Sequence, residues 1–382
     1  MCSTNHSDRS CIIVTVNSGS TSVKLAAFEA RSQDHCTQIG TQISHDHVTG
    51  ENLLPREVLT RFLASLPAAP TAIAHRVVHG GRRFTAAVRI DSSVSATIRE
   101  LSELAPLHNP KAVEWIEAAC SVAGPGVAQV AAFDTAFFAS LPRVAGEYAL
   151  AGRYGVDEGV RRYGFHGLAH EALWRRWSQL HPDLPLGGKV ITLQMGGGVS
   201  AVAIERGKPL DTSMGFSPLE GLVMGTRSGD IDPAVVPYLE KRLRKSSDDI
   251  IALLNRESGV FGLSGGATDL GKLAADPAPQ AQFAVDLYCY RARKYIGAYL
   301  AVLGGCDGII FGGGVGEHVP AVRQRILAGM GWAGIEIDVA ANEAARGQEA
   351  RIDTSRQPVR VYVIPVEEEG VLARAALAIV TE

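Results

Sequence analysis

The chain has 382 residues, of which 46% are hydrophobic and 20% are charged. This length predicts two domains, and the composition excludes an intrinsically disordered protein. A net charge of −3 excludes a general basic surface for nucleic acid and a polybasic patch for membranes.

The cysteines and the N-terminus indicate a cytoplasmic protein. Six cysteines are scattered along the chain without a CxxC pair, so they match neither a zinc site nor a disulfide framework. Single thiols of this kind are typical of a reducing compartment. The first ten residues are polar, unlike a secretory signal, and no apolar stretch is long enough to span a bilayer. We therefore expect no membrane partner.

The first half of the chain begins with a predicted hairpin. Residues 1–10 are expected to be a flexible arm. Two β-branched apolar runs, 11–16 and 23–28, flank a polar turn that begins at Asn17. Further patterns predict strands at 71–78 and 129–133 and helices at 92–104, 110–122 and 166–180.

A second predicted hairpin, 190–194 and 199–205, has a Gly-rich turn and resembles the first. A shift of 177 positions lays it over the first hairpin, with Thr192 on Thr15, Leu193 on Val16, Gln194 on Asn17 and Gly196 on Gly19. Two such halves indicate a duplicated α/β fold with a cleft between them. A coincidence between two ordinary hairpins would give the same pattern.

The second half continues mainly with helices. Apolar residues at helical spacing predict helices at 233–243, 247–256 and 279–303. A strand at 307–311 leads into a Gly-rich loop, and the remaining patterns predict helices at 320–330 and 367–379 and a strand at 359–364.

Three Gly- or Ser-rich turns, each following an apolar strand, are candidate anion sites. They are the segment NSGSTSVK from Asn17 to Lys24, the run Gly196 to Gly198, and the run Gly312 to Gly316. Backbone N–H groups in such turns bind phosphate, and glycine lets a phosphate approach closely. Each turn is equally readable as an ordinary tight turn, and none is a Walker A loop or a GxGxxG fingerprint.

Charged side chains stand in loops beside these turns. The basic candidates in Gly-flanked loops are Arg76, His79, Arg161, Arg162, His166 and Arg227. Arginines there hold carboxylates or phosphates, although a surface ion pair is the commoner role of an arginine. Asp134 ends a buried strand, where active-site carboxylates lie in α/β sheets, or it caps a helix. Glu367 to Glu369 precede the last predicted helix, and their purely structural interpretation is that they complement its dipole. His108 either orients a substrate or is an ordinary buried histidine.

Taken together, these strings resemble the acetate kinase family, of the acetate and sugar kinase/actin-like superfamily. The matching strings are VNSGSTSVK, AHRVVHGG, LAPLHNP, AAFDTAF, RRYGFHG, DTSMGFSPLEGLVMGTRSGDIDP, the GLSG stretch, GGVGE and VIPVEEEG. The resemblance implies an α/β protein with a duplicated actin-like ATPase (ribonuclease H-like) fold and two lobes with a central cleft. We expect the lobes at 11–160 and 161–382, with the closing helix 367–382 packing back on the first.

The resemblance also implies a reaction and a role for each residue. It implies a homodimer that reversibly transfers a phosphoryl group in line from ATP to acetate, giving acetyl phosphate and ADP. Asn17 and Glu368 would bind Mg²⁺ or Mn²⁺. Asp134, His166 and Arg227 would be catalytic, and Arg76 would hold the substrate carboxylate. The acyl pocket would be lined by Val78, Leu107, Phe165 and Pro218. The nucleotide would be bound by Lys24, Gln194, Met195, Gly196, Gly197, Gly198, Asp269, Leu270, Gly271, Gly313, Gly314, Val315, Gly316 and Glu317.

The sequence departs from the family pattern mainly on the nucleotide side. The family's His and Asn in the second phosphate loop are Gln194 and Gly197 here, its Arg is Gly271, and its Asn after GGxGE is His318. FDTAFH ends as FDTAFF, at Phe138. These departures leave open pyrophosphate as donor. The sequence is also compatible with propionate as acceptor and with an inactive ligand-binding relative.

Overall fold

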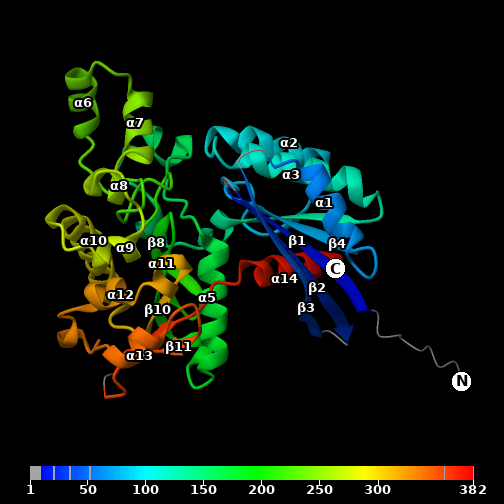
Figure 1. Ribbon diagram of the computed structural model, residues 1–382. Helices are drawn as coiled ribbons and strands as arrows, with labels where there is room; N and C mark the ends of the chain where they lie inside the picture. The colour runs from blue at the N-terminus through cyan, green and yellow to red at the C-terminus, as the bar shows by residue number, and fades with distance from the viewer. Residues whose placement is uncertain (1–9, 20–21, 34–35, 51–52, 357, 382) are drawn as a thin grey trace, which may run out of the picture. The chain divides into compact units, whose positions relative to one another are not determined.

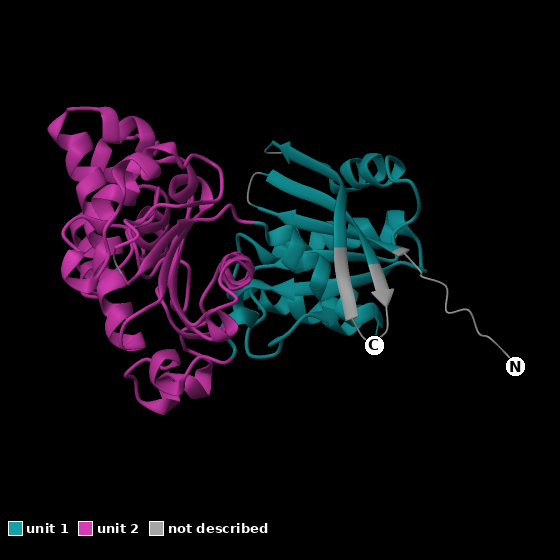
Figure 2. Ribbon diagram, turned by 90° about the horizontal axis from the view of Figure 1, so that it is seen from below, with its two compact units in different colours: residues 1–139, 367–382 teal, residues 140–366 magenta. Residues whose placement is uncertain are grey.

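The computed structural model describes residues 10–19, 22–33, 36–50, 53–356 and 358–381. Its chain forms two compact units (Figures 1 and 2). Unit 1 contains residues 1–139 and 367–382, and unit 2 contains residues 140–366. The boundary that we predicted after residue 160 stays a prediction, and the predicted arm lies outside the described residues except for Ser10.

Unit 1 is a six-stranded mixed sheet with helices. Its strands run in the order β3-β2-β1-β4-β6-β5, and β1, β4 and β6 are parallel neighbours. The strands are β1 (Ser10–Ser18), β2 (Ser22–Gln33), β3 (Cys36–Thr49), β4 (Ala72–Val77), β5 (Val88–Arg89) and β6 (Ala128–Phe133). The helices are α1 (Pro55–Ala64), α2 (Ser92–Glu100), η1 (Leu101–Glu103), α3 (Asn109–Ala123), η2 (Asp134–Phe138) and α14 (Glu368–Thr381).

Alternation along the strands decides which residues of unit 1 enter the core. Val14 and Val16 of β1 and Ile73 of β4 are fully buried against α1 and α3, where Trp115 is among the contacts. Side chains between them point to the opposite face. The helix α14 packs against β1, β4 and β6 (Figure 1). Asn17 of β1 points to the α14 side, because its side chain contacts Glu368 and Glu369 at the start of that helix.

Unit 2 contains a second six-stranded sheet, in the order β11-β12-β10-β7-β8-β9. Its strands are β7 (Lys189–Met195), β8 (Val199–Glu205), β9 (Lys208–Thr212), β10 (Gly308–Gly312), β11 (Ala350–Arg351) and β12 (Arg360–Val363). Its α-helices are α4 (Arg143–Gly146), α5 (Gly167–Leu180), α6 (Val235–Leu243), α7 (Ser247–Arg256), α8 (Gly259–Ser264), α9 (Leu270–Ala275), α10 (Pro279–Leu303), α11 (Gly313–His318), α12 (Pro320–Leu327) and α13 (Val339–Ala344). Short 3₁₀ helices are η3 (Gly152–Tyr154), η4 (Val156–Glu158), η5 (Pro185–Gly187) and η6 (Gly331–Ala333).

The two sheets share one topology. The strands β7 to β12 of the second sheet correspond in chain order to β1 to β6 of the first. Read from its other edge, the second sheet has the order β9-β8-β7-β10-β12-β11, which matches β3-β2-β1-β4-β6-β5 strand by strand. The directions agree too, because β10 is parallel to β7 and β12, just as β4 is parallel to β1 and β6. The duplication that the hairpin repeat predicted is therefore confirmed. Among the described residues no helix is both long and apolar enough to cross a bilayer.

Two local predictions need correction. The strands β3 and β9 were not predicted. The apolar pattern of β3 is weak, because most of its side chains described from residue 40 onward are exposed. The Gly-rich loop predicted after β10 is instead the short helix α11. Gly313 starts that helix with φ +75°, and a Cβ there would lie 2.7 Å from the Met195 carbonyl oxygen. Glycine is required at this position for both reasons.

Buried histidines make the stability of the fold depend on pH. Burial lowers the pKa of His75 to about 4, of His79 to about 4 and of His170 to about 3, so the folded protein keeps all three neutral. In the unfolded chain they would bind protons near their ordinary pKa of 6.5. Above about pH 6.5 these three groups should not lower the free energy of unfolding. Below that pH, each histidine should lower it by about 1.4 kcal/mol per pH unit, down to about pH 4.

Urea unfolding at pH 7.5 and pH 5 tests this expectation. His75→Gln removes one of the three groups, so this variant should lose less stability on acidification than the wild type. Equal free energies of unfolding at the two pH values in the wild type would contradict the account.

Candidate active site

Unit 1 brings three predicted site residues to one edge of its sheet. Asn17, Arg76 and Asp134 lie at or just beyond the carboxyl ends of the parallel strands β1, β4 and β6. Val16 pairs with His75 and Val77 pairs with Phe133, so the three residues lie at neighbouring register positions. This edge is where ligands bind in α/β sheets.

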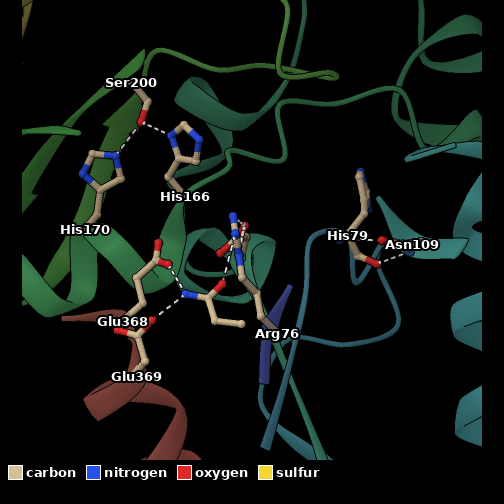
Figure 3. A network of polar contacts seen from close by, with 10 residues as sticks. Arg76, His79, Asn109, His166, His170, Ser200, Glu368 and Glu369 are labelled. Carbon is tan, nitrogen blue, oxygen red and sulfur yellow. Dashed lines mark hydrogen bonds and ion pairs between the residues drawn. The ribbon is translucent and has the colours of Figure 1, made fainter. Parts of the chain in front are cut away.

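The side chains of these residues form one network with the start of α14 (Figure 3). Arg76 donates from Nε and from one terminal nitrogen to Asp134 Oδ2, at 3.1 and 2.7 Å, and from the other to Asn17 Oδ1 at 3.3 Å. Asn17 Nδ2 donates to Glu368 Oε2 at 2.6 Å and to Glu369 Oε1 at 3.1 Å. The strands and the C-terminal helix thus deliver their polar groups to the same place.

The electrostatics of this network favour a cation. The Asp134 side chain is 0% exposed and that of Arg76 is 15% exposed. Burial alone would lower the pKa of the Arg76 guanidinium, but Asp134 and Glu368 more than offset it and hold the pKa above its ordinary value. One arginine faces three carboxylates here, those of Asp134, Glu368 and Glu369. The network therefore carries a surplus of negative charge.

The same network fits Mg²⁺ by its donor chemistry. Carboxylate and amide oxygens are the ligands of hard cations, and Mg²⁺ commonly takes one or two carboxylates together with waters and substrate phosphates. In the described part of the chain no three His, Cys, Asp or Glu side chains form a metal-binding group of their own.

The loop after β4 is held by residues of two other predicted motifs. Asn109 accepts from the His79 N–H at 3.1 Å and donates to the His79 carbonyl at 3.0 Å (Figure 3). Thr135 accepts from the Gly80 N–H at 2.9 Å. Val78, a predicted pocket residue, is buried in this loop, whereas Leu107 is exposed. The motifs LHNP and FDTAF thus fix the backbone beside Val78.

Lys24 lies directly opposite Asn17 in the antiparallel β1–β2 ladder. Opposed residues of such a ladder share a face of the sheet, so Lys24 projects from the face that carries Asn17. Ser20 and Thr21 of the same turn lie outside the described residues, and the predicted anion nest there stays a prediction.

In unit 2 two predicted nucleotide loops meet at one sheet edge. Gly312 pairs with Gln194 across the parallel strands β10 and β7, so the segment Gly196–Gly198 and the start of α11 follow neighbouring strand ends. Gly313 approaches the Met195 backbone too closely for a Cβ. Carboxyl ends of parallel strands followed by glycines and a helix are typical of phosphate sites.

The helix α11 is fixed by two side chains. Glu317 Oε1 accepts from the Gly313 N–H at 2.8 Å and from the Val366 N–H at 3.1 Å, so one oxygen of this carboxylate is bound to the backbone. The buried Arg323 donates five hydrogen bonds, to the carbonyls of Gly316, Glu317, Asn342 and Ala345 and to the Asn342 side chain. These contacts bind both ends of α11, at the Gly313 N–H and at the Gly316 and Glu317 carbonyls.

Asp269 also has a structural contact. Its side chain caps α9 by accepting from the Lys272 N–H at 3.1 Å, and this hydrogen bond is the main reason that its pKa is lowered. Leu270 is buried and Gly271 lies near Val319, so α9 packs beside α11. The predicted nucleotide residues of unit 2 therefore belong to adjoining elements.

The predicted catalytic residues of unit 2 are neighbours. A Cβ on Gly198 would lie 3.2 Å from His166 Nε2 and 3.5 Å from a terminal nitrogen of Arg227. His166 precedes α5 in a left-handed conformation (φ 59°, ψ 28°), which is uncommon outside glycine. Phe165 is buried next to it, and the Pro218 carbonyl accepts from Arg227 at 3.1 Å. The structure thus joins two predicted pocket residues to two predicted catalytic ones.

Arg227 differs from Arg76 and Arg162, each of which pairs with a carboxylate. Arg162 is paired with Glu220 at 2.6 Å and donates to the carbonyls of Thr212 and Ser213, which marks it as structural. Among the described residues Arg227 has no ion pair with any carboxylate, and it donates only to the Pro218 carbonyl and to Met224 Sδ. Burial lowers the pKa of the Arg227 guanidinium. A partly buried cation without a counter-charge is a candidate anion site.

Several residues of these networks were not singled out from the sequence. They are Asn109, Thr135, Ser200 and His170. A signal existed for His170, because it follows His166 by four residues on a predicted helix and so shares its face. No local pattern distinguishes Ser200, which reaches His166 only through the pairing of β7 with β8.

Comparisons with known proteins agree with this geometry. The acetokinase family model matches residues 38–374. An acetate kinase of Clavibacter sepedonicus is 41% identical over 391 residues, covering 96% of this chain and 98% of the relative. The crystal structure of Porphyromonas gingivalis acetate kinase has a TM-score of 0.83 at 33% identity, covering 97% of this chain and 100% of that one. A propionate kinase from Francisella tularensis has a TM-score of 0.84 at 30% identity, covering 96% of this chain and 99% of that one.

The fold class predicted from the sequence is confirmed by the likeness to these solved structures. The family model covers most of the chain, and the aligned relative covers nearly all of it. The chain belongs to the acetokinase family.

Proposed function

We propose that this protein is an acetate kinase, which reversibly transfers a phosphoryl group from ATP to acetate and gives acetyl phosphate and ADP. The observation that carries the proposal is Arg227, a partly buried cation without a carboxylate partner among the described residues, beside His166 and Gly198. A transferring phosphoryl group is the anion that this arrangement would serve. Membership of the acetokinase family supports the assignment.

The chemistry asks little of the protein beyond positioning and charge. A carboxylate oxygen attacks phosphorus directly while the bond to the ADP leaving oxygen breaks, so no proton has to be removed from the nucleophile. We propose that Arg76 holds the acetate carboxylate and that Arg227 and His166 stabilise the equatorial oxygens of the phosphoryl group. Preorganised donors of this kind are usually the largest contribution to catalysis.

We propose that Asn17 and Glu368 hold Mg²⁺ or Mn²⁺ and that Asp134 orients the reacting groups around the metal. The surplus negative charge of this network supports the assignment. When bound, the metal ion would neutralise charge on the nucleotide phosphates. Lys24 lies on the same face and would add a cation near those phosphates.

We propose that the nucleotide is bound by the adjoining segments of unit 2, from Gln194 to Gly198, from Asp269 to Gly271 and from Gly313 to Glu317. Their support is the shared sheet edge and the packing of α9 against α11. The departures from the family pattern at Gln194, Gly197, Gly271 and His318 lie on this side of the site. Pyrophosphate is for this reason the donor to compare with ATP.

For the acceptor, Val78, Leu107, Phe165 and Pro218 would line the acyl pocket. Propionate is the second candidate, because a propionate kinase structure matches this chain as well as an acetate kinase structure does. One methylene in an apolar pocket changes kcat/KM by about 10–200-fold. A comparison of the two acids therefore distinguishes the candidates. We also propose that the protein is a cytoplasmic homodimer, as the family resemblance implies.

The proposal is tested with purified protein, MgCl₂, a phosphoryl donor and an acid, with hydroxylamine present to trap the acyl phosphate as a hydroxamate. We expect hydroxamate with ATP and acetate, at a higher kcat/KM than with propionate. Product with pyrophosphate alone would change the donor. If neither donor gives product with either acid, the remaining hypothesis is that this protein is an inactive, ligand-binding relative of the family.

A further inference from the structure

A chain of hydrogen bonds runs through unit 2 behind His166. His166 Nδ1 lies 2.9 Å from Ser200 Oγ, which lies 2.8 Å from His170 Nε2 (Figure 3). His170 Nδ1 lies 2.7 Å from Thr192 Oγ1. Two of these residues lie at the start of or within α5, and the other two lie on β7 and β8.

The β7–β8 ladder explains why the four side chains meet. Ser200 pairs with Gln194, and Thr192 is two residues from Gln194 on the same strand. Side chains alternate along strands, and opposed residues share a face, so Thr192 and Ser200 project from the same side of the sheet. α5 packs on β7 and carries His170 to both hydroxyls.

The direction of the chain follows from counting hydrogens. Burial lowers the pKa of His170 to about 3, so its ring is neutral and has one N–H and one acceptor nitrogen. Thr192 is fully buried, and within the described part of the chain its hydroxyl bonds to no group other than His170 Nδ1. A buried hydroxyl proton needs an acceptor, so Thr192 donates to His170 Nδ1.

The remaining bonds then have one consistent arrangement. With Nδ1 accepting, His170 carries its proton on Nε2 and donates it to Ser200 Oγ. Ser200 uses its single hydroxyl proton to donate to His166 Nδ1. A neutral His166 that accepts at Nδ1 carries its proton on Nε2, the atom beside Gly198 and Arg227.

We propose that Ser200 and His170 are positioning residues, which hold His166 as the Nε2–H tautomer so that it presents a hydrogen-bond donor to the transferring phosphoryl group. The inference rests on the proposed function only for its last step, the identity of the group that receives the hydrogen bond. It agrees with the reaction's chemistry, because a carboxylate nucleophile needs no base and a donor is the useful form of the histidine.

The tautomer is measured directly by long-range ¹H–¹⁵N correlation spectra of the ¹⁵N-histidine-labelled full-length protein, with His166→Gln used to assign the signals. At pH 8 we expect the His166 Nδ1 shift of a ring nitrogen without a proton and the Nε2 shift of one that carries it. A proton on Nδ1 instead would overturn the proposal, whether or not the protein forms acyl phosphate.

Ser200→Ala removes the hydroxyl with little change in volume. We expect kcat in the hydroxamate assay to fall about tenfold, as expected for one lost hydrogen bond, with little change in KM for acetate. Ser200→Thr keeps the hydroxyl and should recover part of the loss. The matched control is Ser178→Ala, because Ser178 lies on α5, the helix that carries His170, and its buried hydroxyl has no hydrogen-bond partner among the described residues.

The kinetic result separates positioning from general stability. A normal kcat in Ser200→Ala with an unchanged His166 tautomer would overturn the role of Ser200. An equal loss of kcat in Ser178→Ala would overturn it as well, since loss of a buried hydroxyl that does not touch His166 would then have the same effect. If Ser200→Ala does not fold, the wild-type tautomer still decides the proposal. Absence of acyl phosphate in the wild type would count against the proposed function alone.

Discussion

Arg227→Ala should lower kcat for acyl phosphate formation by about 10³–10⁵-fold, as expected for an arginine that stabilises a transferring phosphoryl group. Its stability should not suffer. Among the described residues no carboxylate pairs with Arg227, so the substitution leaves no negative charge unpaired. The variant also avoids the desolvation cost of the Arg227 charge. The hydroxamate assay gives kcat, and urea unfolding gives the free energy of unfolding.

The matched control for Arg227 is Arg346→Ala. Arg346 is an exposed arginine of the same unit, paired with Glu343 at 2.8 Å, and surface pairs contribute little. This variant should be close to wild type in both measurements. An Arg227→Ala enzyme within tenfold of the wild-type kcat would remove Arg227 from the reaction.

Asp134→Ala should lose both activity and stability, in contrast to Arg227→Ala. Asp134 is completely buried and pairs with Arg76 at 2.7 Å. Removing it leaves the Arg76 cation without its nearest counter-charge, and breaking a buried pair in this way costs about 3–5 kcal/mol of the free energy of unfolding. The proposed metal site also loses a carboxylate, so acyl phosphate formation should fall below detection.

A double-mutant cycle with Arg76→Gln checks the physical reason. If the stability loss comes from an unpaired buried charge, Asp134→Ala combined with Arg76→Gln should be more stable than the sum of the two single losses predicts. Additive losses would show that the two side chains do not stabilise each other. Wild-type stability of Asp134→Ala would contradict the buried pair itself.

The sequence predicted the fold where patterns are strong. Apolar runs located both hairpins, and the repeat of Thr15 and Val16 at Thr192 and Leu193 predicted a duplicated fold, which the equal strand order of the two sheets confirms. The strand β3 was missed because its exposed side chains carry little apolar periodicity. The segment after β10 was mistaken for a loop, because glycines weaken the helical signal although Gly313 is required there by its backbone conformation.

The candidate site was predictable to the extent that its residues lie in local motifs. Motifs placed Asn17, Arg76 and Asp134 at strand ends, and parallel pairing brings such ends together. Residues that act from a distance gave no such signal. Asn109 holds the His79 backbone across 30 positions, and Ser200 reaches His166 across 34, so only the folded chain shows these contacts.

The central proposal is that residues of unit 1 and of unit 2 act on one phosphoryl transfer, and inhibition by MgADP, aluminium fluoride and acetate together tests it most directly. Aluminium fluoride mimics the transferring phosphoryl group, so the wild type should be inhibited strongly only when all the components are present. Arg227→Ala and the conservative Asp134→Asn should each abolish this synergy. Full acetate-dependent inhibition in either variant, or inhibition of the wild type that does not depend on acetate, would contradict the proposal.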